Sequence, residues 1–330
     1  PCLRRAVLYP AELRAQIRCG FYLLQIMTSI QLTNEAFIEI NQMNSTSPAA
    51  LSHEDLQKVM TTVDIPTCPA LVSRAMTEAQ KDEPDLRRLA ELISNDPAMS
   101  AAALKLANSP LYRSGSSISG VRQAVDRLGT QNVVCIVVSA ALRSSVSGLP
   151  AAWLESFWKR NRQLALAAAL IARKQYGISP DAAYTYTLFH DAAIPLMMKR
   201  FPEYEKVISK AMIDGKFQVD AEAEYFPCTH PIVGSLLVRN WGLPAILGQA
   251  IRFHHEIDVY ELPDRTLPGG ALSFIAVTQV AEHIAQELLG ETDLDVGAEL
   301  FEKALAHLGI GQEELDDLRA RVAEAIGSEA

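Results

Sequence analysis

Six histidine and carboxylate side chains in the second half of the chain are of the types that bind divalent metal ions. They form an adjacent His-Asp pair, a lone histidine before a proline, a His-His pair and a later acid: His190, Asp191, His230, His254, His255 and Glu282. Imidazole and carboxylate together suit first-row divalent metals such as iron, manganese or zinc, which can activate a water molecule for attack on phosphorus. Each histidine taken alone is more typical of a hydrogen-bonded core residue, but the combination indicates a shared metal site.

The acid at position 282 is expected to point inward. At helical spacing Glu282 shares a face with Ile275, Thr278 and Ala285, whereas His283 lies about 100° round the helix and is expected to be solvated. A buried carboxylate beside buried histidines is costly unless these groups are paired or bind a metal. We therefore expect Glu282 to join the cluster.

The elements that must position these side chains all read as helices, so the fold class is all-α. In the first half, helices begin at Pro69, Asp85, Asp96 and Ser119, each a residue type that starts or caps helices. In the second half, apolar spacing predicts helices over residues 153–176, 181–200, 203–214, 231–240, 244–254, 272–289 and 312–326.

One apolar run has two interpretations. Residues 133–138 are rich in β-branched side chains and would suit a strand, but the run continues to Leu142 and has no partner strand, so we expect a buried helix. Residues 121–142 also have the helix–Gly–helix shape of DNA readers, with Gly129 between the helices. The second helix offers no basic side chain before Arg143, so we expect no DNA binding by it.

Composition excludes several classes of protein. The chain has 330 residues, of which 49% are hydrophobic and 21% charged, and this excludes a disordered protein. A net charge of −9 disfavours a protein that coats nucleic acid. The five cysteines form no CxxC pair, and the most apolar stretch near the start, residues 19–34, is interrupted by polar side chains. We therefore expect a cytoplasmic protein without a membrane span.

The chain is expected to divide into three parts. Residues 1–50 form an N-terminal extension that ends in a flexible joint at residues 44–48, and translation of the native protein is hypothesised to start at Met43. Residues 51–149 form an N-terminal helical lobe. Residues 150–330, which follow the boundary at Gly148-Leu-Pro150, form a second helical lobe with the histidines and acids.

Together with the order of helices, these residues resemble the HD superfamily of metal-dependent phosphohydrolases. The span from about Ile65 to Leu289 more specifically resembles the HDOD family, the HD-related output domain of bacterial signalling proteins. The resemblance rests on sequence blocks at residues 65–70, 92–98, 104–112, 121–129, 230–237, 241–244 and 250–255. It implies a two-lobed all-α fold, with an N-terminal helical bundle packed on an HD-like lobe, and a role in signal transduction.

The chain departs from the pattern of HD enzymes in several places. Their earlier histidine, on the first helix of the HD lobe, corresponds here to Arg160 or Asn161, and neither is a good ligand. HD-GYP phosphodiesterases continue His-Asp with Ile-Gly-Lys, whereas residues 192–195 contain no lysine. The Gly-Tyr-Pro signature of those enzymes is absent after His254-His-Glu256, and the last acid is a glutamate instead of the usual aspartate.

These departures favour a non-catalytic regulatory module with a degenerate metal site, acting through a signalling protein partner or a nucleotide ligand. We hypothesise that Arg160 pairs with Asp191 in place of the missing metal charge. The alternative function is that of a metal-dependent phosphohydrolase with a phosphodiester or nucleotide substrate. Asp191, His230, His254 and His255 could still hold a single ion of iron, manganese or zinc.

Overall fold

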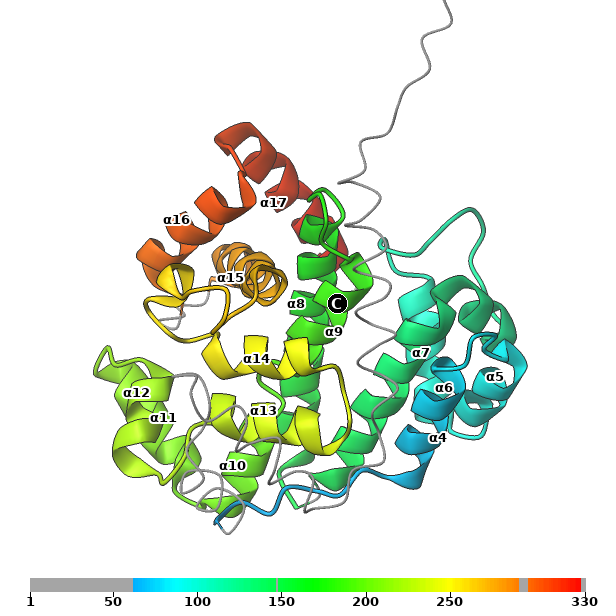
Figure 1. The fold of residues 1–330 in the computed structure, drawn as a ribbon, viewed down its shortest axis with the longest axis horizontal. Coiled ribbons are helices and arrows are strands. Elements are labelled where there is room, and N and C mark those ends of the chain that lie inside the picture. The colour runs from blue at the N-terminus through cyan, green and yellow to red at the C-terminus, as the bar shows by residue number, and fades with distance from the viewer. Residues whose placement is uncertain (1–61, 147, 291–295, 328–330) are drawn as a thin grey trace, which may run out of the picture. The chain divides into compact units, whose positions relative to one another are not determined.

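The computed structural model describes residues 62–146, 148–290 and 296–327, and this part of the chain consists of helices joined by turns and loops, without a strand (Figure 1). The predicted all-α class is therefore confirmed. The described residues all belong to one compact unit, Leu51–Ala330. The predicted extension over residues 1–50, with its joint and Met43, lies outside the described residues.

Four helices make up the described part before Gly148. They are α4 (Ala70–Ala79), α5 (Leu86–Ser94), α6 (Pro97–Ala107) and α7 (Val121–Ser145). The predicted starts hold where an aspartate caps the helix. The Asp85 carboxylate accepts a hydrogen bond from the backbone N of Arg87 at 2.8 Å, and the Asp96 carboxylate accepts from the backbone N of Ala98 at 2.8 Å. Each cap satisfies a backbone donor that the first helical turn leaves unpaired.

Helix α7 consists of two helices separated by a break at Gly129, which has φ 73° and ψ 177°. Val133, Val137 and Val138 in its second half are buried, so the apolar run is a core helix, as predicted. By length and composition α7 could also span a membrane, but 56% of its most apolar window is buried against the rest of the protein. Packing against other helices therefore accounts for its apolar character.

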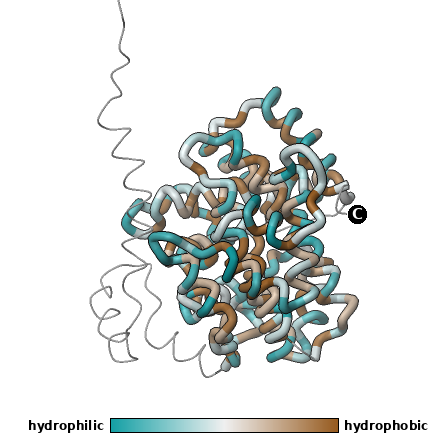
Figure 2. The backbone as a smooth tube through the Cα atoms, turned by 90° about the vertical axis from the view of Figure 1, so that its right-hand side faces the viewer, coloured by the Kyte–Doolittle hydropathy of each residue, from teal (hydrophilic) through white to brown (hydrophobic). Residues whose placement is uncertain are grey.

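The remaining helices follow Gly148. They are α8 (Ala151–Ala172), α9 (Pro180–Phe189), α10 (Ile194–Arg200), α11 (Tyr204–Ile213), α12 (Gln218–Tyr225), α13 (His230–Asn240), α14 (Ala245–Phe253), the 3₁₀ turn η1 (Val259–Glu261), α15 (Gly269–Leu289), α16 (Gly297–Leu308) and α17 (Gln312–Gly327). Helices α8 and α9 form an antiparallel hairpin, and α15 packs against both of them and against α14, α16 and α17 (Figure 1). Figure 2 shows hydrophobic segments running through the interior between these helices.

One expectation about the helices was wrong, and two helices were not foreseen. The predicted helix over residues 181–200 is two helices, α9 and α10, with His190 and Asp191 in the turn between them. Pro195 lies in the first turn of α10, where its missing N–H leaves no hydrogen bond unmade. Helices α12 and α16 were not predicted, and both contribute to the surroundings of the site.

Hydrogen bonds connect the segments on either side of Gly148. The indole Nε1 of Trp241 donates to the carbonyl of Pro66 at 2.8 Å, and the Tyr112 hydroxyl donates to the carboxylate of Asp181 at the start of α9. Trp241 is buried. The division into lobes at residues 51–149 and 150–330 stays a prediction.

Candidate metal centre

Four helices bring the predicted site residues together. His190 and Asp191 directly follow α9, His230 is the first residue of α13, and His254 and His255 follow the end of α14. Glu282 lies within α15, which packs against both α9 and α14. Most of the site side chains therefore sit at helix ends. The side chains that come close together in two overlapping groups are those of His190, Asp191, His230, His254, His255 and Glu282.

Four of these residues form a first group, in which the ligand atoms all lie within 4.8 Å of one another: Asp191, His230, His254 and His255. The Nε2 atom of His230 is 3.1 Å from Nε2 of His255 and 3.4 Å from Nε2 of His254. Asp191 Oδ1 is 3.4 Å from His230 Nε2 and 3.5 Å from His254 Nε2. Three imidazoles and one carboxylate thus face a common point.

These separations fit a metal ion. A tetrahedral ion with ligand atoms at about 2.0–2.1 Å holds them roughly 3.3–3.4 Å apart. Four of the six separations within the first group lie between 3.1 and 3.5 Å and bracket that value, and all six are within 4.8 Å. A set of three imidazoles and a carboxylate also suits zinc, iron or manganese. The donor set of the first group therefore fits a single divalent ion.

The far nitrogens of two imidazoles are held by backbone carbonyls. Nδ1 of His190 is 2.6 Å from the carbonyl of Thr187, and Nδ1 of His254 is 2.7 Å from the carbonyl of Ile251. A carbonyl oxygen can only accept, so each Nδ1 carries the proton and donates. In the neutral ring, the lone pair is then on Nε2, the nitrogen that faces Asp191. This is the tautomer that a metal ligand needs.

A second group consists of His190, Asp191 and Glu282 and shares Asp191 with the first. Nε2 of His190 is 3.0 Å from Asp191 Oδ2 and 3.0 Å from Glu282 Oε1. His190 is 1% exposed. A single imidazole nitrogen therefore lies between two carboxylates, which is the arrangement of an ion pair as well as of a three-ligand metal site.

Glu222 is a site residue that sequence reasoning missed. It lies on α12, its side chain is 0% exposed, and its Oε2 is 2.8 Å from Nδ1 of His230. The backbone N of His230 also donates to Glu222 Oε2 at 2.7 Å. A glutamate in a short polar helix reads as solvated, and the sequence holds no signal that would have placed this one beside His230.

Charges around Asp191 shift the pKa values of the acidic and basic groups in opposite directions. Burial raises the pKa of Asp191, but the imidazoles around it prevail and hold that pKa well below its usual range. For His190, burial is outweighed by Asp191 and Glu282, and the pKa lies well above its usual value. Burial likewise opposes charge on His230, yet Glu222 and Asp191 raise its pKa to about 10. Without an ion, protons on His190 and His230 offset the negative charges of Asp191 and Glu222, whose pKa values are both lowered.

The His-His pair behaves in the opposite way. Burial lowers the pKa of His254, and burial together with the neighbouring imidazoles holds the pKa of His255 well below its usual value. Both rings are therefore neutral near pH 7, with a lone pair available on one nitrogen. Neutral imidazole is the form that binds a metal.

Arg160 and Asn161, the two positions that correspond to the first histidine of HD enzymes, lie on α8. Asn161 is 2% exposed and its Nδ2 has no hydrogen-bond partner among the residues that the structure describes, whereas Arg160 is half-buried. The contacts of Asp191 described above are with His190, His230 and His254. The hypothesis that Arg160 pairs with Asp191 is not tested by these contacts and stays a prediction.

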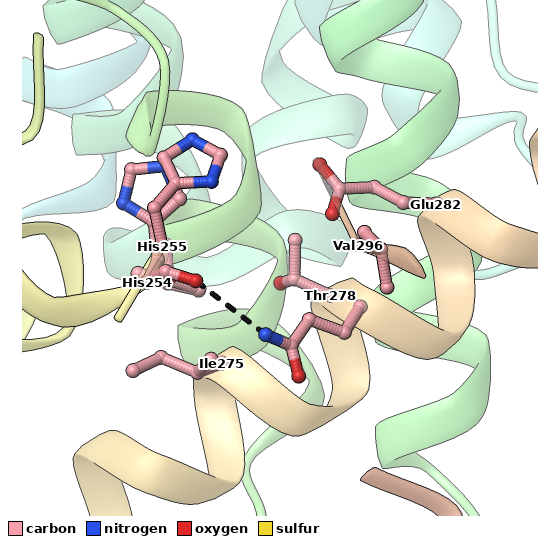
Figure 3. A pocket seen from close by; sticks show the side chains of 8 residues that line it. His254, His255, Ile275, Thr278, Glu282 and Val296 are labelled. Carbon is pink, nitrogen blue, oxygen red and sulfur yellow. Dashed lines mark hydrogen bonds between the residues drawn. The ribbon is translucent and has the colours of Figure 1, made fainter. Parts of the chain in front are cut away.

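A small cavity lies beside the cluster (Figure 3). Its volume of about 10 Å³ leaves room for about one water molecule. It is lined by Tyr186, His254, His255, Ile275, Thr278, Gln279, Glu282 and Val296. Glu282 and Thr278 reach it from the same face of α15, as the helical spacing predicted (Figure 3). His283, which was expected to be solvated, is instead half-buried and stacks on Phe301 of α16.

Comparison with known proteins now decides the family. The HDOD domain matches residues 65–257, a span that contains every residue of the first group and Glu222 but not Glu282. This chain belongs to the HDOD family. The match covers more than half of the chain and is consistent with the resemblance to the HD superfamily that the His-Asp and His-His pairs indicated.

Solved structures share this fold at low sequence identity. An HDOD domain protein of unknown function from Geobacter sulfurreducens is 21% identical with a TM-score of 0.61, over 84% of this chain and 97% of that one. A proposed phosphohydrolase from Shewanella amazonensis is 23% identical with a TM-score of 0.62, over 84% and 97%. A proposed signal transduction protein from Marinobacter aquaeolei is 18% identical with a TM-score of 0.62, over 91% and 66%.

A curated relative adds no function. It is an uncharacterised protein of Treponema pallidum, 24% identical over 207 residues, and the HDOD chain spans only 38% of its length. The likeness to the solved structures concerns the fold. The family and the described helices together make this chain an all-α HDOD protein.

Proposed function

We propose that this HDOD protein is a cytoplasmic signal-transduction module that acts by binding a partner, and that its first group of ligands holds one divalent metal ion without hydrolysing a substrate. The observation that supports the metal site is that the four donor atoms all lie within 4.8 Å of one another, with four of their six separations between 3.1 and 3.5 Å. Asp191, His230, His254 and His255 would hold the ion. With four protein ligands, it would cross-link helix ends as structural metal sites do.

Three features support the absence of hydrolysis. A catalytic ion keeps a coordination position open for water or substrate, whereas here four protein side chains would fill a tetrahedral ion. In the second group, His190 is already engaged by the carboxylates of Asp191 and Glu282. The cavity beside the cluster has a volume of about 10 Å³, which admits a water molecule but no nucleotide.

Elemental analysis tests the metal. The full chain is produced without a polyhistidine tag, purified without chelator and analysed for iron, manganese and zinc. We expect one ion per chain, and the loss of that ion in His254→Ala. The matched control is His307→Ala, because His307 is an exposed histidine on α16 outside the site. A metal-free protein that also fails to take up added zinc would contradict the proposal.

A phosphohydrolase remains the second candidate, and one observation favours it. Asp191 belongs to both ligand groups, as a carboxylate that bridges the ions of a two-metal site would. The test is hydrolysis of cyclic di-GMP and of a generic phosphodiester with added manganese. Turnover that disappears in His190→Ala would establish the enzyme, and we expect no turnover above that of the variant.

A further inference from the structure

The carboxylate of Glu222 lies behind His230, on the side of the ring away from the other ligands. Its Oε1 and Oε2 are 2.9 and 2.8 Å from Nδ1 of His230, whereas Nε2 of His230 faces Asp191, His254 and His255. Glu222 is therefore no member of the two ligand groups. It can act on a bound ion only through His230.

A set of donors holds this carboxylate in place. The hydroxyl of Tyr204 on α11 donates to Oε1, and the amide of Gln218 donates to Oε1 at 3.3 Å and to the Tyr204 hydroxyl at 3.1 Å. Tyr204 is buried, and Glu222 is fully so. A charge removed from water in this way is tolerable only when it is hydrogen-bonded and paired. Residues of α11 and α12 thus hold the Glu222 carboxylate in place independently of its contact with His230.

His230 differs from the other imidazoles in what its Nδ1 meets. The Nδ1 atoms of His190 and His254 face neutral backbone carbonyls, whereas that of His230 faces a negative charge. A carboxylate on the far nitrogen fixes the ring and makes the near nitrogen a stronger ligand. His230 is also the ligand whose Nε2 is close to all three others, at 3.1–3.4 Å.

We propose that Glu222 is the positioning residue of the metal centre: it holds the His230 ring in the ligating tautomer and orientation and increases the affinity for the ion, while Tyr204 and Gln218 hold Glu222. This inference rests on the proposed metal site. In this inference, residues of α11 and α12 increase the metal affinity of a site whose ligands all lie on other elements.

The same carboxylate also accepts from the backbone N of His230 at the start of α13, so a purely structural role must be separated from the positioning role. A helix cap contributes to folding stability in the metal-free protein. It does not alter the ligand field of an ion in the folded protein. Two readouts distinguish the roles: zinc affinity by chelator competition, and the visible absorption spectrum of bound cobalt(II).

The test compares Glu222→Gln with Glu224→Gln in the full chain. Both change a carboxylate of α12 to an amide, but Glu224 is exposed and pairs with Lys216. We expect Glu222→Gln to weaken zinc binding about 10–100-fold and to shift the cobalt spectrum. Glu224→Gln should match the wild type in both. Circular dichroism and thermal unfolding of the metal-free proteins report folding separately.

Each outcome has one meaning. A folded Glu222→Gln protein with wild-type zinc affinity and cobalt spectrum would overturn the inference while leaving the metal site intact. A wild-type protein that binds neither zinc nor cobalt would overturn the proposed function itself. Should Glu222→Gln fail to fold, Tyr204→Phe replaces it, because it removes one donor to the carboxylate. Weaker zinc binding by that variant supports the inference, and unchanged binding refutes it.

Discussion

The carboxylate of Asp191 faces three imidazoles, with Oδ2 3.0 Å from His190 Nε2 and Oδ1 3.4 and 3.5 Å from the Nε2 atoms of His230 and His254. It is the one acid of the first group and the residue shared with the second. Its negative charge therefore raises the pKa values of imidazoles in both groups.

Replacing that charge gives the first prediction. Asp191→Asn keeps the size of the side chain but removes the anionic ligand, so zinc affinity should fall at least ~100-fold, beyond the 10–100-fold typical of outer-shell partners. Chelator competition measures the change. Asp214→Asn, at the exposed end of α11, is the control and should bind zinc as the wild type does. Equal affinity of both variants would show that Asp191 is no ligand.

At the scale of residues, the sequence was informative about ligands and uninformative about what holds them. His-Asp and His-His pairs are recognisable because their types are rare and chemically specific. Glu222 is one of many glutamates, and its burial depends on packing of α11 and α12 that no local pattern encodes. His283 was misplaced for the same reason, because α16, which covers it through Phe301, was not predicted.

Among the elements, the break in α7 rests on a single backbone conformation. Gly129 has φ 73° and ψ 177°, a region that is open essentially to glycine alone, and a Cβ there would meet no atom within 4 Å. Gly129→Ala should therefore lower the free energy of unfolding by about 1–3 kcal/mol through backbone strain alone. Gly120→Ala, at φ −105°, should change it by less than about 0.5 kcal/mol. Urea unfolding measures both, and equal stability of the two variants would contradict the expectation.

A second glycine sets how closely two ligand-bearing helices approach. A Cβ on Gly234 of α13 would lie 2.9 Å from Cγ2 of Ile251 on α14, whereas a Cβ on Gly248 would meet only ordinary contacts at 3.5 Å or more. Overpacking costs about 1–3 kcal/mol, of which alanine's helix propensity returns up to about 1 kcal/mol. Gly234→Ala should therefore be less stable than Gly248→Ala in thermal unfolding. It should also bind zinc more weakly, since α13 starts with His230 and α14 ends before His254.

The element boundaries show where sequence reasoning stops. Capped starts such as Asp85 and Asp96 were predictable because the cap is a local hydrogen bond. The turn after α9 was missed although Pro195 signalled it, because the apolar residues on both sides continue the helical spacing. That turn is what lets adjacent His190 and Asp191 face one site, whereas a continuous helix would point them about 100° apart.

At the scale of the whole molecule, Tyr112 connects the segments on either side of Gly148 through hydrogen bonds. Its hydroxyl donates to Asp181 of α9 and lies 2.9 Å from the amide oxygen of the fully buried Asn132 on α7. Hydrogen bonds to charged groups are worth about 1.5–3 kcal/mol, so Tyr112→Phe should lower the free energy of unfolding by that amount. Tyr176→Phe, at a side chain 92% exposed, should leave it unchanged. Urea titrations in which both variants match the wild type would contradict this.

Three of the ligand-bearing helices offer their imidazoles at a terminus: His190 after α9, His230 at the start of α13 and His254 after α14. When a helix tilts about its packed middle, the residues at its ends move furthest. A small tilt of one of these helices would therefore change the distances between the ligand nitrogens. In the proposed metal centre, a partner that tilts one of these helices would change the affinity for the ion, and by reciprocity a bound ion would oppose the tilt.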